Sequence, residues 1–163
     1  MVLLKNSVFW NDTKEGSNGD GIDLSGSDRV TIEGAQIANM GDKGVSIGEA
    51  CSNIEIKKTT IWKTNLGIAS KDHSSARISD SVIYGTSIGL DLYRKKQEYL
   101  KAGDIVAERV TLGGNKQEFR IADGGVLTIS QSHLQTAYPG DGNDLQVPSE
   151  EFLLPPLLRA IKK

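Results

Sequence analysis

The segments Ile56-Lys-Lys-Thr-Thr-Ile61 and Ile78-Ser-Asp-Ser-Val-Ile83 share one pattern: two aliphatic residues stand five positions apart, with a small or β-branched residue three after the first. The second segment starts 22 residues after the first. The pattern recurs at intervals of about 22 to 24 residues, apart from two longer ones. The six pairs are Leu4 and Phe9, Ile32 and Ile37, Ile56 and Ile61, Ile78 and Ile83, Ala107 and Leu112, and Ile129 and Leu134. A repeat of this length predicts a solenoid in which each repeat forms one coil.

A second short segment, usually opened by glycine, lies between successive aliphatic pairs. Inward and outward residues alternate within it with a period of two, which is the period of a β-strand. The members are Gly21-Ile-Asp-Leu24, Gly44-Val-Ser-Ile47, Gly67-Ile-Ala-Ser70, Gly89-Leu-Asp-Leu92 and, without the glycine, Phe119-Arg-Ile121. One coil alone cannot bury its apolar side chains, so equivalent strands must stack and pair in parallel. The sequence therefore predicts an all-β parallel β-helix of about six coils.

Residues 11–20 and 93–103 lengthen two of the repeats, and we expect a loop at each. We divide the chain into β-helix coils over residues 1–147 and a C-terminal tail over residues 148–163, where the composition shifts to a proline-interrupted apolar stretch. The tail is expected to close the last coil as a short helix or cap, or else to dock on a partner. The first coil starts with unpaired strand edges, so we expect contacts with a further N-terminal part of the same protein.

The repeats from Asp20 to Ile129 resemble the right-handed parallel β-helix repeats of the pectate-lyase-like superfamily. Three segments are similar, more narrowly, to a bacterial β-helix module near the end of larger surface or secreted proteins. They are Gly44-Val-Ser-Ile-Gly-Glu49, Gly67-Ile-Ala-Ser-Lys-Asp72 and Tyr93-Arg-Lys-Lys96. The resemblance implies a right-handed coil and an extracellular or cell-surface location. Better-known members act on acidic polysaccharides, but the tight Asp cluster with a basic residue that pectate lyases share is absent here, so lyase activity does not carry over.

Composition excludes several other classes of function. The formal net charge is −2 with both signs interspersed, which is unlike the basic surface of a nucleic-acid-binding protein. The single cysteine, Cys51, can form neither an internal disulfide nor a zinc site without further ligands. No apolar run approaches the length of about 20 residues that spans a bilayer, so we expect no membrane insertion. Residues 1–10 also lack the layout of a signal peptide.

Two aromatic residues are predicted to stand above one another on the outside of the coils. The position just after the second aliphatic residue carries Trp62 in one coil and Tyr84 in the next. Equivalent residues of neighbouring coils are about 4.8 Å apart, so the two rings should form an exposed pair. Such a pair could bind the apolar face of a sugar ring; mutual stacking or burial beneath the tail is the alternative.

Charged residues gather where the glycine-opened strands end. This column reads Gly26, Glu49, Asp72, Arg94 and Asp123, with Arg94 expected as the partner of Asp72 on the next coil. In the middle of the same strands the outward positions are Asp23, Ser46, Ala69, Asp91 and Arg120, and Asp91 should pair with Arg120. Carboxylates and basic groups on one edge could bind an acidic sugar, and a solvated charge ladder is the alternative. The candidate ligand-binding residues are therefore Trp62, Tyr84, Glu49, Lys71, Asp91, Arg120 and Asp123.

The same edge supplies residues for an enzymatic alternative. A lyase or epimerase removes a proton from a uronate ring, and an Arg or Lys could act as the base while a carboxylate or Ca²⁺ holds the uronate group. Asp72, Arg94 and Lys95 are the candidate catalytic residues. No metal-ligand set is evident in the sequence, and Ca²⁺ is left open as a cofactor.

Three functions follow from this reading. The leading hypothesis is a carbohydrate-engaging β-helix module of an exported bacterial protein, non-catalytic by itself, with a polysaccharide or glycan as its partner. The second is a polysaccharide lyase or epimerase that acts on acidic polysaccharide. The third is a structural spacer or assembly module, which would have an inert surface.

Overall fold

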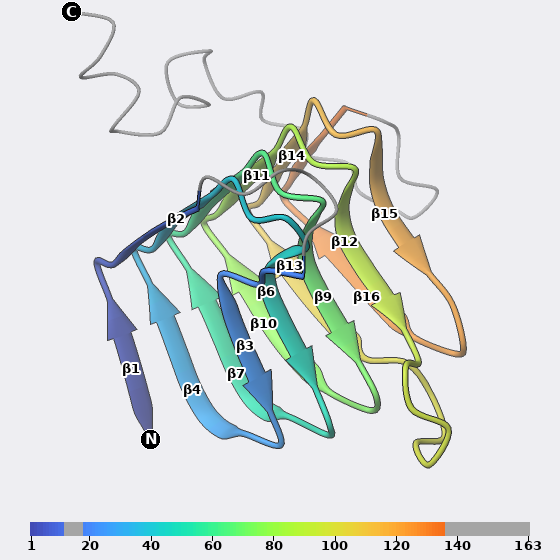
Figure 1. Cartoon of the computed structure of the whole chain (residues 1–163). Coiled ribbons are helices and arrows are strands. Elements are labelled where there is room, and N and C mark those ends of the chain that lie inside the picture. Colours follow the sequence, from blue (N-terminus) through green and yellow to red (C-terminus); the bar gives the residue numbers. More distant parts are fainter. Residues whose placement is uncertain (12–17, 136–163) are drawn as a thin grey trace, which may run out of the picture.

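The computed structural model describes residues 1–11 and 18–135, and within them the chain forms 17 strands and no helix. The strands lie in three parallel sheets that form the sides of a coiled prism (Figure 1). Sheet A contains β1 (Val2–Lys5), β4 (Asp28–Glu33), β7 (Ser52–Lys57), β10 (Ser75–Ser79), β13 (Asp104–Glu108) and β16 (Val126–Ser130). Sheet B contains β2 (Val8–Trp10), β5 (Gln36–Ala38), β8 (Thr60–Trp62), β11 (Val82–Tyr84), β14 (Thr111–Gly113) and β17 (His133–Leu134). Sheet C contains β3 (Ile22–Ser25), β6 (Lys43–Gly48), β9 (Leu66–Lys71), β12 (Ile88–Tyr93) and β15 (Gln117–Ile121).

Equivalent residues of successive coils are directly paired, as the repeat predicts. On sheet A, Ile56 pairs with Ile32 on one side and with Ile78 on the other. On sheet B, Ile61 pairs with Ile83. All five side chains are completely buried. Each coil therefore adds one residue to an aliphatic stack on sheet A and one to a second stack on sheet B. Burying one such side chain stabilises the fold by roughly 1.5–3 kcal/mol. The three parallel sheets confirm the predicted all-β parallel β-helix.

The turn from sheet A to sheet B is two residues long in every coil. Its first residue has a left-handed backbone; these residues are Asn6, Gly34, Lys58, Asp80, Arg109 and Gln131. The second residue is the small one of the repeat, and it points inward at the corner. Ser81 Oγ, for example, accepts a hydrogen bond from the backbone N–H of Thr59 in the previous coil over 3.1 Å. The two-residue turn therefore explains the fixed spacing of five within each pair.

Glycine opens the strands of sheet C because neighbouring coils approach closely at this corner. A Cβ on Gly44 would lie 2.7 Å from the carbonyl oxygen of Gly67 in the next coil. Glu118 occupies the equivalent place in the last described coil, next to Gly89. Its carboxylate is buried and accepts a hydrogen bond from Asn115 Nδ2 over 2.7 Å, and burial raises its pKa.

The longer of the two expected loops is present. β12 ends at Tyr93 and β13 begins at Asp104, so the predicted loop at 93–103 is confirmed. Residues 12–17 of the other expected loop lie outside the described residues. The predicted boundary at 147 and the tail over 148–163 also lie outside them, so both stay predictions.

Candidate functional site

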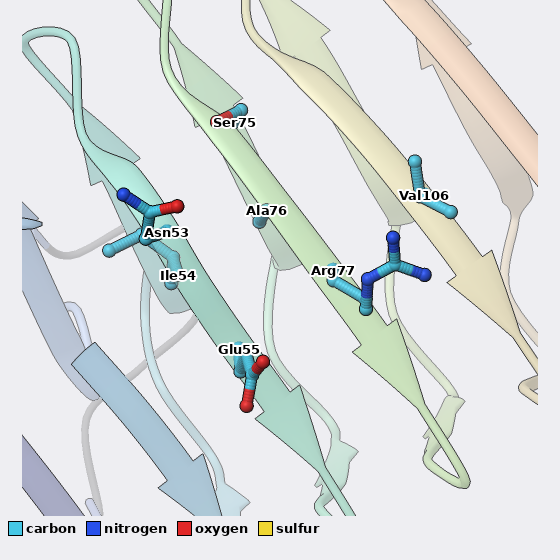
Figure 2. Close-up of a pocket in the computed structure, with 7 residues that line it drawn as sticks. All are labelled: Asn53, Ile54, Glu55, Ser75, Ala76, Arg77 and Val106. Carbon is cyan, nitrogen blue, oxygen red and sulfur yellow. The ribbon is translucent and has the colours of Figure 1, made fainter. Parts of the chain in front are cut away.

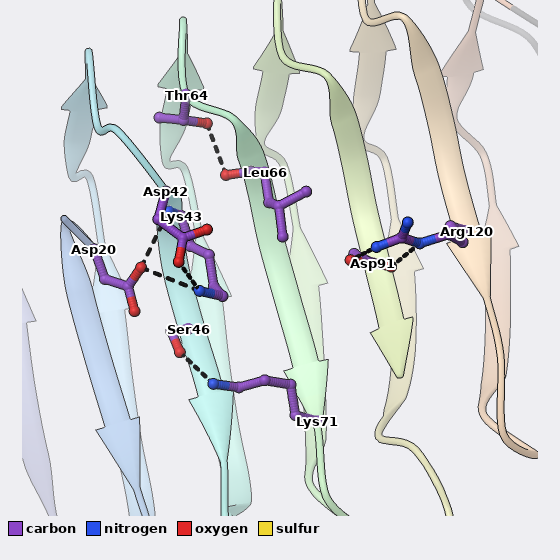
Figure 3. Close-up of polar contacts among 9 residues, drawn as sticks. All are labelled: Asp20, Asp42, Lys43, Ser46, Thr64, Leu66, Lys71, Asp91 and Arg120. Carbon is purple, nitrogen blue, oxygen red and sulfur yellow. Dashed lines mark hydrogen bonds and ion pairs between the residues drawn. The ribbon is translucent and has the colours of Figure 1, made fainter. Parts of the chain in front are cut away.

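The outer face of the middle strands of sheet C is buried although it carries charged side chains. Every residue of β6 and of β9 is buried. We call this surface the C face and define it by the polar residues on sheet C and the turns that enter it. They are Asp20, Asp42, Lys43, Ser46, Lys71, Asp91 and Arg120 (Figure 3). Buried ionisable groups cluster at functional sites more often than elsewhere, so the C face is the candidate site.

Lys43 is held by two carboxylates at the start of β6. Its Nζ lies 3.4 Å from Asp20 Oδ1 and also donates to Asp42 Oδ2. The backbone N–H of Lys43 donates to the same Asp20 oxygen over 3.1 Å. Burial alone would lower the pKa of this lysine, but the hydrogen bond to Asp42 and the charge of Asp20 outweigh it and raise the pKa. Lys43 is therefore a charged and fully paired ammonium at neutral pH.

Lys71 lies one strand further along the C face, and its ammonium has a different environment. The side chain crosses from β9 to β6, where Nζ donates to Ser46 Oγ over 2.8 Å (Figure 3). Gly48 leaves room for this path, since a Cβ there would lie 3.2 Å from Lys71 Cε. Burial and, secondly, the charge of Lys43 lower the pKa of Lys71. The ion pairs found among residues 1–11 and 18–135 do not include Lys71, so its side-chain partner is a hydroxyl and not a carboxylate.

Asp91 and Arg120 form the pair that the sequence predicts. Arg120 Nε donates to Asp91 Oδ1 over 2.8 Å, and its Nη2 donates to Oδ2 over 2.6 Å. The Asp91 side chain is 0 % exposed, whereas that of Arg120 is 51 % exposed. The hydrogen bond to Asp91 raises the pKa of Arg120. One face of the guanidinium therefore remains open to a ligand while the other holds the buried carboxylate.

An apolar patch separates Lys71 from this pair. Leu66, Ala69 and Ile88 form a small buried cluster of their own, and Tyr93 packs against it. Tyr93 pairs in register with Lys71 on the neighbouring strand. Burial raises the pKa of the Tyr93 phenol, which stays neutral at physiological pH. The C face thus places a cation, an aromatic ring and a half-exposed guanidinium on three neighbouring strands.

The predicted aromatic pair exists, but it is not exposed as we expected. Trp62 and Tyr84 are stacked with ring centroids 6.4 Å apart and an interplanar angle of 4°. Trp10 contacts the other side of Trp62 edge-on at 6.1 Å, because the residue between them in the column is the small Ala38. Trp62 is consequently buried, and Tyr84 is half-buried. The prediction of an exposed Trp62 platform is wrong, and the exposed indole of this column belongs to Trp10.

The candidate catalytic residues lie next to one another, but Asp72 has a structural role that we did not predict. Its buried Oδ1 accepts the backbone N–H groups of Lys95 and Lys96 over 2.7 and 2.9 Å, in place of the expected Arg94 side chain. Arg94 donates its own backbone N–H to Asp123 Oδ2 over 3.1 Å. The side chains of Arg94, Lys95 and Asp123 are exposed. Asp72 and Asp123 therefore fix the start of the loop over residues 94–103.

Glu49 is also engaged at this edge. Its Oε1 accepts a hydrogen bond from Lys96 Nζ over 2.6 Å, and this bond lowers the pKa of Glu49 and raises that of Lys96. Both side chains remain partly open to solvent. The ion pair joins two coils that are not adjacent, so it braces the loop and leaves Glu49 outside the C face.

A shallow hollow of about 280 Å³ lies on the opposite side of the molecule, on sheet A (Figure 2). It is lined by Asn53, Ile54, Glu55, Ser75, Ala76, Arg77 and Val106. Glu55 and Arg77 are register partners on β7 and β10, and Arg77 turns toward Val106. The side chains of Glu55 and Arg77 are exposed, so the hollow holds no buried charge. The hollow therefore lacks the buried charged side chains that distinguish the C face.

Residues 1–11 and 18–135 contain no group of three or more His, Cys, Asp or Glu side chains placed to hold a metal ion. In the same residues there is no helix of the length and hydropathy that a membrane crossing requires.

Comparison with known proteins supports the geometry of the coil. The profile of the right-handed β-helix region matches residues 2–140. The chain belongs to the right-handed β-helix family. Neither the curated proteins nor the solved structures gave a match to it. Membership in this family gives the fold and the handedness of the β-helix, and the C face supplies the argument for function.

Sequence reasoning about this β-helix found part of the C face and missed the rest. Lys71, Asp91 and Arg120 were predicted and lie on it. Lys43 was missed because it stands immediately before the glycine, and only the residues after the glycine were aligned as a column. Ser46 was placed on the outer face by the alternation of β6, but no signal marked it as the partner of Lys71. An alignment of the residue before each glycine would have shown Lys43 next to Leu66 and Ile88.

Proposed function

We propose that this β-helix is a carbohydrate-engaging module of an exported protein and that it holds an acidic saccharide on the C face. One observation carries the proposal: Lys71 is a buried ammonium whose side-chain partner is the hydroxyl of Ser46. Among residues 1–11 and 18–135 no carboxylate forms an ion pair with this ammonium, although Asp23 and Asp20 act on its charge from further away. A buried charge is costly, so a bound carboxylate in direct contact would stabilise it. The uronate group of an acidic sugar is a carboxylate of this kind.

The neighbours of Lys71 fit the rest of a sugar ring. Tyr93, its register partner, supplies a partly buried aromatic ring next to which the apolar face of a sugar could pack. The half-exposed guanidinium of Arg120 can bind a second carboxylate, because Arg matches carboxylates with two parallel hydrogen bonds. Lys95, which is exposed directly after β12, adds positive charge at the same edge. An extracellular location belongs to the proposal, since polysaccharides of this class are met outside the cell.

The proposal is tested by affinity electrophoresis in gels that contain a polyuronate or a neutral glucan. The wild-type protein should be retarded by the polyuronate, and Lys71→Met should weaken this retardation by about tenfold in Kd because the cation is lost. Lys63→Met is the matched control, since Lys63 is exposed on the turn after β8. Retardation that is equal for wild type and Lys71→Met would contradict the proposed site. Trp10→Ala, tested in the neutral gel, reports separately on the exposed indole.

A second candidate function is favoured by the lowered pKa of Lys71. A lysine whose amine is neutral more often than usual can act as a general base, so Lys71 could remove a proton from a bound uronate in a lyase or epimerase reaction. Lys71 would then take the place of Arg94 or Lys95 as the base, while Asp72, the carboxylate expected near the base, uses its Oδ1 to accept two backbone N–H groups. A rise in ultraviolet absorbance from unsaturated uronates, measured over a panel of uronans with and without Ca²⁺, would support the lyase. If the protein binds the uronans but the absorbance does not rise, the lyase is contradicted and the binding module is the function supported.

A further inference from the structure

Two lysines of the C face are buried to the same extent but have different contacts. Lys43 is 6 % exposed and Lys71 is 7 % exposed. The Lys43 ammonium contacts two carboxylates, whereas the Lys71 ammonium contacts the hydroxyl of Ser46 over 2.8 Å (Figure 3). None of the ion pairs in the described part of the chain includes Lys71. The two side chains therefore separate the effect of a direct carboxylate from the effect of burial.

The strongest charge that acts on Lys71 is another ammonium, that of Lys43. Burial, and after it this charge, lowers the pKa of Lys71, whereas the carboxylates of Asp42 and Asp20 outweigh burial and raise the pKa of Lys43. A buried lysine next to a second cation holds more free amine than an ordinary lysine does, and the free amine is a nucleophile. Of these two buried lysines, Lys71 is therefore the one whose nitrogen is available for covalent chemistry.

Further charged groups interact with Lys71 more weakly than Lys43 does. They are Asp23, Lys95, Asp20 and Glu49. The carboxylates among them are already paired or solvated: Asp20 binds Lys43, Glu49 is ion-paired with the loop after β12, and Asp23 is exposed to water. An anion at the position of the Lys71 ammonium would therefore be attracted by Lys43 more strongly than any one of these carboxylates repels it.

We propose that Lys71 is an acceptor site for carbon dioxide, at which Nζ is reversibly carboxylated to a carbamate. In this step the free amine forms an N–C bond to the carbon of carbon dioxide, and an electron pair of one C=O bond moves to oxygen. The nitrogen then releases a proton to water. Compared with the ammonium, the lysine has lost two protons in all, and its charge has changed from positive to negative. The step needs no oxidant, reductant or metal ion.

The contacts of Lys71 fit the carbamate as well as the amine. The Ser46 hydroxyl accepts a hydrogen bond from the ammonium, and the same group can rotate to donate one to a carbamate oxygen. The repulsion between Lys71 and Lys43 becomes an attraction once the charge of Lys71 is reversed. Because the Lys71 side chain is not completely buried, a molecule as small as carbon dioxide can reach it.

Carboxylation would also regulate saccharide binding on the C face, and this consequence rests on the proposed function. A carbamate at Lys71 repels a uronate, so bicarbonate should weaken the retardation of the wild-type protein in the polyuronate gel by about tenfold in Kd. Sodium chloride at the same ionic strength is the control for screening. Equal weakening by the two salts would overturn the regulation. Absence of retardation in both would contradict the proposed function and not the carbamate, which is measured without a saccharide.

Carbon-13 NMR with labelled bicarbonate tests the carbamate itself, at about pH 8.5, where an ordinary lysine is still an ammonium. Wild type and Lys63→Met should both show a protein-bound carbamate carbon that Lys71→Met lacks. Lys63 is exposed, so its replacement is the matched control. The α-amino group of Met1 also reacts with carbon dioxide, and its carbamate should appear in all three proteins as an internal positive control.

Trapping of the carbamate with an alkylating oxonium salt, followed by peptide mapping, locates it in the wild-type protein without any substitution. Lys71 should be modified at least about tenfold more than Lys43, which is equally buried but held by carboxylates. A carbamate at Met1 alone would overturn the proposal. Equal modification of Lys43 and Lys71 would also overturn it, because the direct carboxylates would then make no difference.

Discussion

Two arginine–aspartate bridges join neighbouring coils of this β-helix, and they differ in burial rather than in geometry. In the turns that leave sheet A, Arg109 binds Asp80 with Nε and Nη2. On the C face, Arg120 binds Asp91 with the same two nitrogens, and each pair spans 29 residues. The Asp80 side chain is 40 % exposed, whereas that of Asp91 is 0 % exposed. The comparison shows that equal sequence spacing gives a solvated ladder on one face and a buried ionic site on the other.

Removing the arginine of each bridge should separate the two cases most clearly. Arg120→Ala leaves the Asp91 carboxylate buried and unpaired, and we expect the free energy of unfolding to fall by about 3 kcal/mol. Arg109→Ala leaves a carboxylate that water can solvate, so its effect should be a small fraction of that. Chemical denaturation of both variants measures the difference. Equal losses would mean that the C face is solvated in the same way as sheet A.

A neutral buried group gives a third environment for comparison. Tyr84 on sheet B is half-buried with a phenol oxygen that has no hydrogen-bond partner among residues 1–11 and 18–135, and burial raises its pKa to about 12. The folded state therefore keeps this proton to higher pH than the unfolded chain, whose tyrosine titrates near 10. Stability from this source is complete below pH 10 and should be lost as the pH rises from about 10 to about 12, by about 2 kcal/mol.

Tyr84→Phe is the control for that titration. It removes the phenol but keeps the ring that stacks on Trp62. Thermal unfolding of the variant should show a weaker loss of stability over the same pH range, while the wild type and the variant differ little at pH 7. An unchanged pH dependence would assign the alkaline loss to other groups.

The smallest effect on stability is expected at Lys71, whose side-chain hydrogen bond is to a hydroxyl and not to a carboxylate. Lys71→Met keeps the volume of the side chain and removes a buried charge, so the free energy of unfolding at pH 7 should rise by about 1 kcal/mol. The sign follows from the lowered pKa: between the folded and the ordinary value the unfolded chain binds more protons, so the wild type becomes more stable as the pH rises. Denaturation of Lys71→Met and Lys63→Met at pH 7 and pH 10 checks this. A destabilised Lys71→Met would indicate that the lysine supports the fold.

The comparison also explains how far the sequence predicted this molecule. Apolar residues at a fixed spacing define the core, because apolar side chains that recur with the period of the coil must share one buried stack. The stacking of Ile56 on Ile78 could therefore be predicted from the sequence. The pairing of Asp91 with Arg120 followed from the same register. Comparison of one repeat with the next therefore predicted the core and this buried ion pair.

Features that depend on single positions were not predictable in this way. Trp62 was expected to be exposed, but Ala38 lets Trp10 reach it across two coils. Asp72 was expected beside the side chain of Arg94, but the loop after Tyr93 turns its backbone N–H groups toward the carboxylate. Neither the gap above Trp62 nor the path of the loop repeats in other coils, so no column in the sequence reveals them.

The central claim is that the ammonium of Lys71, which is hydrogen-bonded to the Ser46 hydroxyl and forms no ion pair with the described residues, gains a carboxylate in direct contact from an acidic saccharide. It is tested most directly by following the titration of Lys71 by NMR, with and without an oligouronate. We expect a pKa below the ordinary lysine value in the free protein and a clear increase when the ligand is present, because a carboxylate beside the ammonium favours its protonated form. A pKa that is the same in both conditions would contradict the claim.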